Sequence, residues 1–301
     1  MRIATTTTGL AVVGADESLV PLSSLISGSP GEMRAFIEAG ETLWSRARSA
    51  AANARGGASA SAIRLLAPIP VPRRDVFCVG WNYSEHFEEG RLVHGGAAPT
   101  ELPEHPALFS KGPNTIIGPE AGVLFPAPHS TELDWEVELA VIIGRGGRDI
   151  DAADGLSHVF GYTVANDISV RDVQLHRHGG QWFKGKNFDT HLPMGPWIVT
   201  ADEIPNPHSL HLGTRVNGIV KQDSSTRHMV FTIPRIIEEL SAGLELVPGD
   251  LILTGTPPGV GFARTPPEFM RVGDVVEVEV EGVGKLRNPI VARTPAASVW
   301  G

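Results

Sequence analysis

The sequence predicts a β-rich α+β protein, with a small amino-terminal α/β domain at residues 1–70 and a larger domain at residues 71–301. Two observations support this prediction. From Val71 onward, short runs of β-forming residues are punctuated by Gly and Pro, and no repeated strand–helix–strand unit is evident. Before that point lie a helical segment, a stretch of small residues and several closely spaced prolines, which favour a domain boundary near residue 70.

Composition narrows the range of functions. A chain of 301 residues with 42% hydrophobic content can bury a full core. The formal net charge of -9, without any cluster of Lys and Arg interleaved with aromatics, argues against a nucleic-acid surface. Cys78 is the single cysteine and permits no internal disulfide, and no apolar run is long enough to span a membrane. We therefore expect a cytoplasmic protein that binds neither nucleic acid nor membrane.

One helix is predicted in the first domain. Ser29, Pro30 and Glu32 form a capping-box pattern, with serine at the cap, proline at the first helical position and glutamate at the third. The residues that follow at helical spacing and would form one packing face are Met33, Phe36, Ile37, Gly40, Leu43, Trp44 and Ala47.

Two helices are predicted in the larger domain. One opens near Asp167, at the end of a β-branched run. The other starts at about Thr232, with Pro234 near its beginning and Gly243 at its end.

Three acids stand two residues apart in the segment LDWEVELAVIIG: Asp134, Glu136 and Glu138. On a β-strand they would project from one face, with neighbours about 7 Å apart. The apolar run that follows indicates a strand entering the core, where carboxylates lose water and repel each other. Because a cation would remove that penalty, we expect this strand to supply ligands to a hard divalent metal.

Spacing alone does not show that these acids bind a metal, because the same spacing recurs near the carboxyl end in Glu277, Glu279 and Glu281. There the acids alternate with valines, which is typical of a strand with one solvated face.

The segment GYTVANDISVRDVQ places polar residues beside the expected metal. Asp167 stands at a cap position, where its ordinary role is to accept backbone hydrogen bonds. Arg171 and Gln174 follow on the same helical face. An arginine there could pair the carboxylate of a 2-oxo acid, although a salt bridge to Asp167 or Asp172 is the alternative.

Two lysines flank a glycine in QWFKGKNFDTHLPMGP. Lys184 has the pattern of a solvated surface residue, whereas Lys186 stands between Phe183 and Phe188 and before a turn. A lysine near a metal could stabilise an enolate or transfer a proton.

His86 and Glu89 lie three residues apart in CVGWNYSEHFEEG. On a helical turn Glu89 could orient the imidazole of His86 as a general base for water, although an exposed acidic turn would contain such pairs by chance. Residues 88–105 then form either a mobile surface loop or an active-site lid.

A glycine- and threonine-rich loop follows the apolar strand in VPGDLILTGTPPGVG. It is not a Walker loop, because no GKS or GKT follows. Its backbone N–H groups and the hydroxyl of Thr256 could hold an anionic end of a substrate, but an ordinary turn is equally consistent.

Taken together, these segments resemble the fumarylacetoacetate hydrolase family. The matches run in order through much of residues 73–291: GWNYSEH with Glu89, PALFSK, LDWEVELAVIIG, ANDISVRDVQ, KGKNFDT with PMGP, VNG with KQ, and PGDLILTGTPPGVG. The resemblance implies a β-rich, sandwich-like roll as the catalytic domain, a homodimer, and a bound Mg²⁺ or Mn²⁺.

The resemblance also implies a role for each matching residue. Glu136, Glu138 and Asp167 look like the metal ligands, and Asp134 does not match a ligand position. The substrate-side residues would be Arg171, Gln174, Lys186 and Thr256, with His86 and Glu89 as the pair that activates water in a lid at residues 84–105.

The activity that follows is hydrolysis of a carbon–carbon bond in a 2,4-dioxo acid, such as fumarylpyruvate, to pyruvate and a carboxylic acid. His86 would activate the water, and the metal and Lys186 would stabilise the pyruvate enolate. Oxaloacetate decarboxylation, or isomerisation or hydration of 2-hydroxy-dienoates in aromatic catabolism, is the alternative. A non-catalytic protein that binds a metal or ligand is the alternative from another class.

Overall fold

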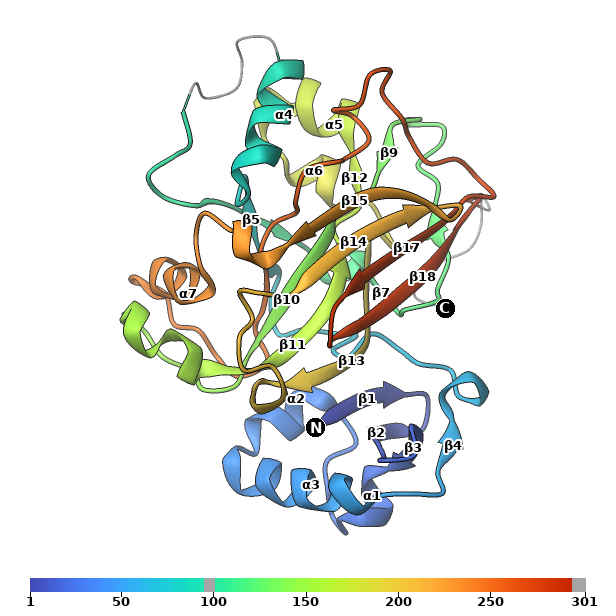
Figure 1. Ribbon diagram of the computed structural model, residues 1–301, viewed down its shortest axis with the longest axis vertical. Helices are drawn as coiled ribbons and strands as arrows, with labels where there is room; N and C mark the ends of the chain where they lie inside the picture. Colours follow the sequence, from blue (N-terminus) through green and yellow to red (C-terminus); the bar gives the residue numbers. More distant parts are fainter. Residues whose placement is uncertain (95–100, 294–301) are drawn as a thin grey trace.

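The computed structural model describes residues 1–94 and 101–293 and confirms a strand-rich α+β fold. Within these residues the largest sheet has eleven strands (Figure 1). Their order is β4 (Ala58–Ser59), β3 (Ser18–Pro21), β2 (Gly9–Val13), β1 (Arg2–Thr6), β13 (Leu192–Thr200), β11 (Val159–Asn166), β10 (Val137–Ile143), β16 (Leu251–Leu253), β5 (Val76–Gly80) and β6 (Ala107–Lys111), with β7 (Ile116–Ile117) beside β13. A second sheet contains β15 (Ile219–Ser225), β14 (His211–Val216), β17 (Val275–Val280), β18 (Gly284–Val291) and β8 (Val123–Leu124), and a short pair joins β12 (Ser169–Val170) to β9 (Leu133–Asp134).

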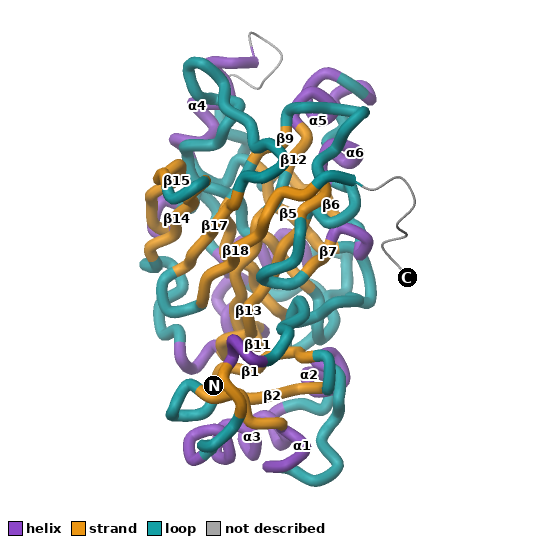
Figure 2. Tube along the Cα trace, turned by 90° about the vertical axis from the view of Figure 1, so that its right-hand side faces the viewer, coloured by secondary structure: helices purple, strands orange, loops and turns teal. Residues whose placement is uncertain are grey.

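Most of the α-helices lie at the two ends of the molecule. In Figure 1, α1 (Leu22–Leu25), α2 (Met33–Glu38) and α3 (Glu41–Asn53) lie at the bottom, whereas α4 (Ser84–His94), α5 (Arg171–His176) and α6 (Phe183–Lys186) lie together at the top. The view from the side in Figure 2 shows the same separation. No helix among the described residues is long and apolar enough to cross a membrane.

Strand β10 is buried on both faces. Its odd-numbered residues from Val137 to Ile143 belong to the core that includes the second sheet, and Ala140 and Ile142 pack on the opposite side in a core shared with α2 and α3. A strand covered by two layers has no solvated face. Carboxylates at the beginning of β10 are therefore held away from bulk water.

Helix prediction succeeded in one place and failed in another. Helix α7 (Ile233–Ser241) starts after Thr232 and is followed by Gly243, as predicted. The capping box at Ser29 does not form, because α2 begins only at Met33 and no side chain caps it. The single predicted helix is also broken at Gly40, whose φ of 78° lies in the left-handed region.

The predicted boundary at residue 70 is crossed by the large sheet. Strand β1 pairs with β13, with Arg2 opposite Val199 and Ile3 opposite Ile198. The division into two domains stays a prediction.

Strand ends converge below α4, α5 and α6. The beginning of β10 pairs with the end of β11, Val137 opposite Asn166, and the antiparallel strand β16 ends nearby. Because β5 runs parallel to β16, the end of β5 at Gly80 reaches the same edge of the sheet. Segments far apart in the sequence therefore meet at this edge.

Candidate active site

Three predicted ligands come together at the beginning of β10. Carboxylate oxygens of Glu136, Glu138 and Asp167 lie within 4.8 Å of one another, and all three side chains are buried. Glu138 lies on β10, Glu136 immediately precedes it, and Asp167 immediately follows β11. Asp167 is not a helix cap, because Ser169 and Val170 pair with β9 and α5 starts only at Arg171.

Asp134 does not belong to this cluster, although its spacing predicted that it would lie on the same face of the strand. The predicted strand is interrupted at Trp135 and Glu136, so that Asp134 belongs to β9 and not to β10. The Asp134 carboxylate accepts hydrogen bonds from the backbone N–H groups of Gly261 (2.7 Å) and Phe262 (3.0 Å) and from Arg171 Nε (2.7 Å). It anchors the arginine and the loop after β16.

Two buried lysines are paired with the acidic cluster. Lys186 Nζ lies 2.8 Å from Glu136 Oε2 and 2.6 Å from Asp167 Oδ2, and Lys111 Nζ lies 2.8 Å from Asp167 Oδ1. Lys111 is fully buried and had no role assigned from the sequence. Its position in PALFSK, at the end of an apolar strand, was the only available signal.

The aromatic surroundings of Lys186 differ from those predicted. Its Nζ lies 5.1 Å from the centroid of the Phe109 ring, on β6. Phe188 lies instead beneath Lys184, and Phe183 is 55% exposed. The neighbour of Lys186 in space comes from a strand that is distant in sequence.

Arg171 is held by protein groups at all three nitrogens of its guanidinium. Besides the bond from Nε to Asp134, Nη2 lies 2.7 Å from Glu136 Oε1, and Nη1 donates to Gln174 Oε1 at 2.9 Å. The predicted salt bridge to Asp167 or Asp172 is therefore replaced by pairs with two other acids.

The charges in this site suit a bound cation. Four buried carboxylates face three buried cations: Asp134, Glu136, Glu138 and Asp167 against Lys111, Arg171 and Lys186. Among the described residues Glu138 has no ion-pair partner, and its Oε2 accepts one hydrogen bond from Gly255 N at 2.6 Å. Three carboxylates around one point form a donor set that hard divalent cations prefer.

The pKa values of the two glutamates differ in direction. Burial, followed by the charges of Asp167 and Glu136, raises the pKa of Glu138 well above its usual range. Burial acts in the same direction on Glu136, but Lys186 and Arg171 outweigh it and lower the pKa of Glu136 to about 2. Without a cation, the charged form of Glu138 is therefore disfavoured more than that of Glu136.

His86 and Glu89 form the predicted pair on α4. His86 Nδ1 lies 2.9 Å from Glu89 Oε1, and Glu89 also accepts a hydrogen bond from Gly259 N at 2.8 Å. These contacts fix the imidazole and tie α4 to the loop after β16. Residues 95–100 of the predicted lid lie outside the described residues, so closure of a lid stays a prediction.

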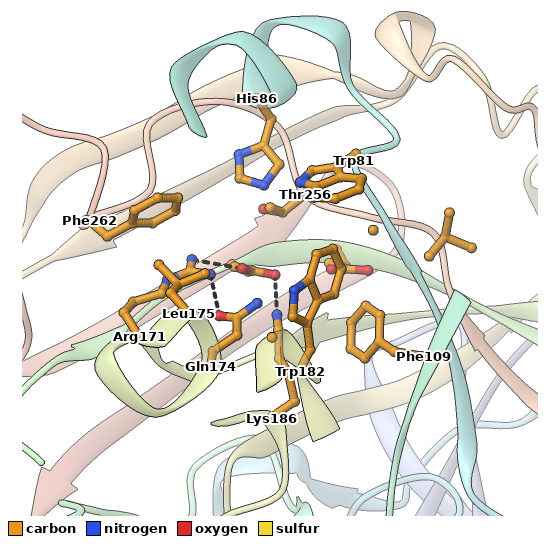
Figure 3. Close-up of a pocket in the computed structure, with 15 residues that line it drawn as sticks. Trp81, His86, Phe109, Arg171, Gln174, Leu175, Trp182, Lys186, Thr256 and Phe262 are labelled. Carbon is orange, nitrogen blue, oxygen red and sulfur yellow. Dashed lines mark hydrogen bonds and ion pairs between the residues drawn. The ribbon is translucent and has the colours of Figure 1, made fainter. Parts of the chain in front are cut away.

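One cavity of about 220 Å³ contains most of the predicted site (Figure 3). The predicted residues that line it are His86, Glu136, Glu138, Arg171, Gln174, Lys186 and Thr256. Thr256 Oγ1 accepts a hydrogen bond from Gln222 Nε2 at 2.8 Å, which leaves its own hydrogen for another acceptor. The sequence did not reveal the aromatic side of the cavity, formed by Trp81, Phe109, Trp182 and Phe262.

Comparisons with known proteins find a matching family model and similar sequences. The family model for the fumarylacetoacetate (FAA) hydrolase C-terminal region matches residues 75–291. The mitochondrial oxaloacetate tautomerase FAHD2A of Bos taurus is 43% identical over 273 residues, which cover 91% of this chain and 84% of the relative.

Two solved structures are similar along their whole length. A putative HpcE protein from Mycobacterium smegmatis has a TM-score of 0.87 and 34% identity, covering 98% of this chain and 100% of the other. Maleylpyruvate hydrolase from Sphingobium sp. SYK-6, in complex with manganese(II) ion and pyruvate, has a TM-score of 0.78 and 30% identity, with coverage of 98% and 100%.

Proposed function

The chain belongs to the fumarylacetoacetate hydrolase family, and from this premise we propose that it interconverts the enol and keto forms of oxaloacetate. The observation that carries the proposal is its 43% identity to an oxaloacetate tautomerase over most of both chains. The main expectation from the sequence was carbon–carbon hydrolysis. The proposed reaction is closer to the alternative given there, which was decarboxylation of oxaloacetate or isomerisation or hydration of 2-hydroxy-dienoates. All of these reactions remove or add a proton next to a 2-oxo group.

The acidic cluster would hold the metal. Glu136, Glu138 and Asp167 offer the oxygens, and the solved relative with manganese and pyruvate supports a divalent ion of the Mg²⁺ or Mn²⁺ type. When bound, such an ion supplies Lewis-acid polarisation of a substrate oxygen.

Side chains of the pocket would move the proton. The imidazole of His86, oriented by Glu89, takes a proton from carbon 3 of the keto form, and Glu89 stabilises the resulting imidazolium. The ammonium of Lys186 stabilises the negative charge that develops on the oxygen of carbon 2. Return of the proton to that oxygen gives the enol, so that no atom is gained or lost.

The products of the wild-type protein test this proposal. With Mg²⁺ or Mn²⁺, the protein should accelerate the loss of the enol absorbance of oxaloacetate without accelerating the release of pyruvate, and EDTA should return the rate to that measured without protein. Pyruvate with carbon dioxide would indicate a decarboxylase instead. Metal binding without turnover of any 2-oxo acid would favour the non-catalytic alternative.

Acylpyruvate hydrolysis is the second candidate, and the hydrogen bond between His86 and Glu89 favours it. A carboxylate-supported imidazole is suited to activating water, and the similar maleylpyruvate hydrolase supports the same reaction class. Incubation with an acylpyruvate should then release pyruvate and a carboxylic acid, and His86→Ala should reduce this rate by about 10²- to 10⁴-fold. An unchanged rate in His86→Ala would rule out this role for the histidine.

The expected homodimer and cytoplasmic location stay proposals. Light scattering of the purified protein would measure its mass in solution. The name of the bovine relative includes a mitochondrial location, which differs from the expected compartment.

A further inference from the structure

Two tryptophans in the pocket differ from the other tryptophans of the described residues. The indole N–H groups of Trp44, Trp135 and Trp197 donate to backbone carbonyls at 3.0, 3.2 and 2.9 Å. Trp81 and Trp182 both line the pocket, and neither indole N–H has a hydrogen-bond acceptor among the described residues. Neither nitrogen is among the buried side-chain atoms without a partner, so both are open to the cavity, and two N–H donors are available there to a ligand with acceptors.

The two indoles are fixed before any ligand binds. Their rings meet edge to face with centroids 4.8 Å apart, and the Phe109 ring lies 5.5 Å from that of Trp182. A Cβ at Gly80 would lie 2.4 Å from Cζ3 of Trp182, so glycine is needed for the indole to lie across the end of β5.

The backbone at Trp81 is also held in place. Trp81 has a φ of 55°, a conformation that is costly for a bulky residue and is found where the surrounding structure enforces it. The next residue, Asn82, is fully buried and donates hydrogen bonds to the carbonyls of Phe231 (3.0 Å) and Thr254 (2.7 Å). The ring of Trp81 is therefore preorganised at the side of the pocket.

Gln174 supplies a third donor. Because Gln174 Oε1 accepts from Arg171, its amide nitrogen points the other way, and it has no acceptor among the described residues. In Figure 3 the side-chain nitrogens of Trp81, Trp182 and Gln174 are turned toward the interior of the pocket. These donors are neutral, whereas the ammonium of Lys186 and the guanidinium of Arg171 are already paired with acids.

A carboxylate carries only acceptors and matches this set of donors. A methyl group in the same place would leave the N–H groups without partners, which is costly in a desolvated pocket. We propose that Trp81, Trp182 and Gln174 bind the carboxylate remote from the 2-oxo group, and so select dicarboxylic over monocarboxylic 2-oxo acids. The identification of that ligand as oxaloacetate rests on the proposed function.

Two ligands that differ only at this position provide the test. Oxaloacetate and 2-oxobutanoate share the 2-oxo acid end, and a methyl in the second replaces the remote carboxylate of the first. Titration calorimetry of the Mn²⁺-loaded protein would measure both dissociation constants for wild type, Trp81→Phe and Trp182→Phe. Each variant is expected to bind oxaloacetate about 10- to 100-fold more weakly, with little change for 2-oxobutanoate, because one hydrogen bond to a charged group is lost.

Two controls separate hydrogen bonding from shape. Phe109→Leu changes the same wall without removing an N–H, and it should affect both ligands equally. Incorporation of 3-benzothienylalanine at position 182 keeps the bicyclic shape and replaces the N–H by sulfur, and it should reproduce the selective loss.

Equal weakening of both ligands in the tryptophan variants, or no weakening of either, would overturn the inference. The proposed function fails separately, if the wild-type protein does not interconvert the tautomers of oxaloacetate. The ratio of the two dissociation constants can be measured in either case, so the two failures are distinguishable.

Discussion

Glutamates with the same spacing occur in opposite surroundings at the beginning of β10, as Glu136 and Glu138, and on β17, as Glu277 and Glu279. Glu138 on β10 is 1% exposed, whereas Glu279 on β17 is exposed to solvent. The reason is that β10 lies between two apolar layers, while β17 buries only the face that carries Val276, Val278 and Val280. Alternation determines which residues share a face, but the packing of layers determines whether that face is hydrated.

Because the two groups of glutamates differ in burial, their ion-pair partners differ as well. Near β10, charges are balanced by fully buried lysines and an arginine, and one carboxylate is left for a cation. Near β17, Glu277 pairs with Lys285, which is 47% exposed. Only the buried cluster needs its counterions to remain folded, and only there can a metal gain strongly from carboxylates.

Removal of one carboxylate from each strand should give the largest difference between the two strands, in both metal affinity and turnover. Glu138→Gln keeps the shape of the side chain and removes the charge, so we expect Mn²⁺ affinity to fall by more than about 100-fold and turnover to be lost. Glu279→Gln should leave both unchanged. Calorimetric titration with Mn²⁺ and the tautomerisation assay would measure these effects.

The metal-free stability of Glu138→Gln provides an internal control. Because burial and neighbouring acids disfavour the charge of Glu138, the variant should be at least as stable as wild type to denaturant without metal. Wild-type affinity for Mn²⁺ in Glu138→Gln would show that the acidic cluster is not the metal site.

Loss of a buried counterion should have the next largest effect, a decrease in the free energy of unfolding. Lys186→Met leaves Glu136 and Asp167 without the ammonium that contacts both, and should lower the free energy of unfolding by about 3–5 kcal/mol. Urea denaturation of the metal-free protein would measure the loss. Added Mg²⁺ should recover part of it, since a divalent ion supplies positive charge to the same oxygens.

A stability of Lys186→Met within about 1 kcal/mol of wild type would contradict this account. It would mean that water reaches the carboxylates and that the cluster behaves like the acids of β17. A gain in stability with Mg²⁺ that is the same in wild type and variant would show that lysine and metal act at different places.

The sequence was informative where chemistry depended on local spacing. Spacing predicted that Glu136 and Glu138 would lie side by side and that His86 would meet Glu89 within one helical turn, whereas Asp167 was implied as the third ligand by the family resemblance. Their roles stay predictions, because geometry alone does not assign them.

Features that depend on distant segments were not predictable from spacing. Lys111 reaches Asp167 from β6, and the Trp81 and Trp182 rings meet across the ends of β5 and α6. Asp134 was placed on the metal strand because alternation was assumed to continue through Trp135. The buried indole of Trp135, bonded to Gly259 O, occurs where the strand is interrupted.

Loss of the exposed ion pair between β17 and β18 should have the smallest effect on stability. Lys285 Nζ lies 2.9 Å from Glu277 Oε1, and Arg287 Nε remains 3.8 Å from the same oxygen if the lysine is removed. Water and a second cation therefore compensate for the loss, so Lys285→Met should cost about 0–1 kcal/mol of unfolding free energy. Urea denaturation at low salt and at 1 M salt would detect the remaining contribution, which should disappear at the higher concentration. A loss as large as that of Lys186→Met, unaffected by salt, would mean that layer burial does not explain the difference between the two strands.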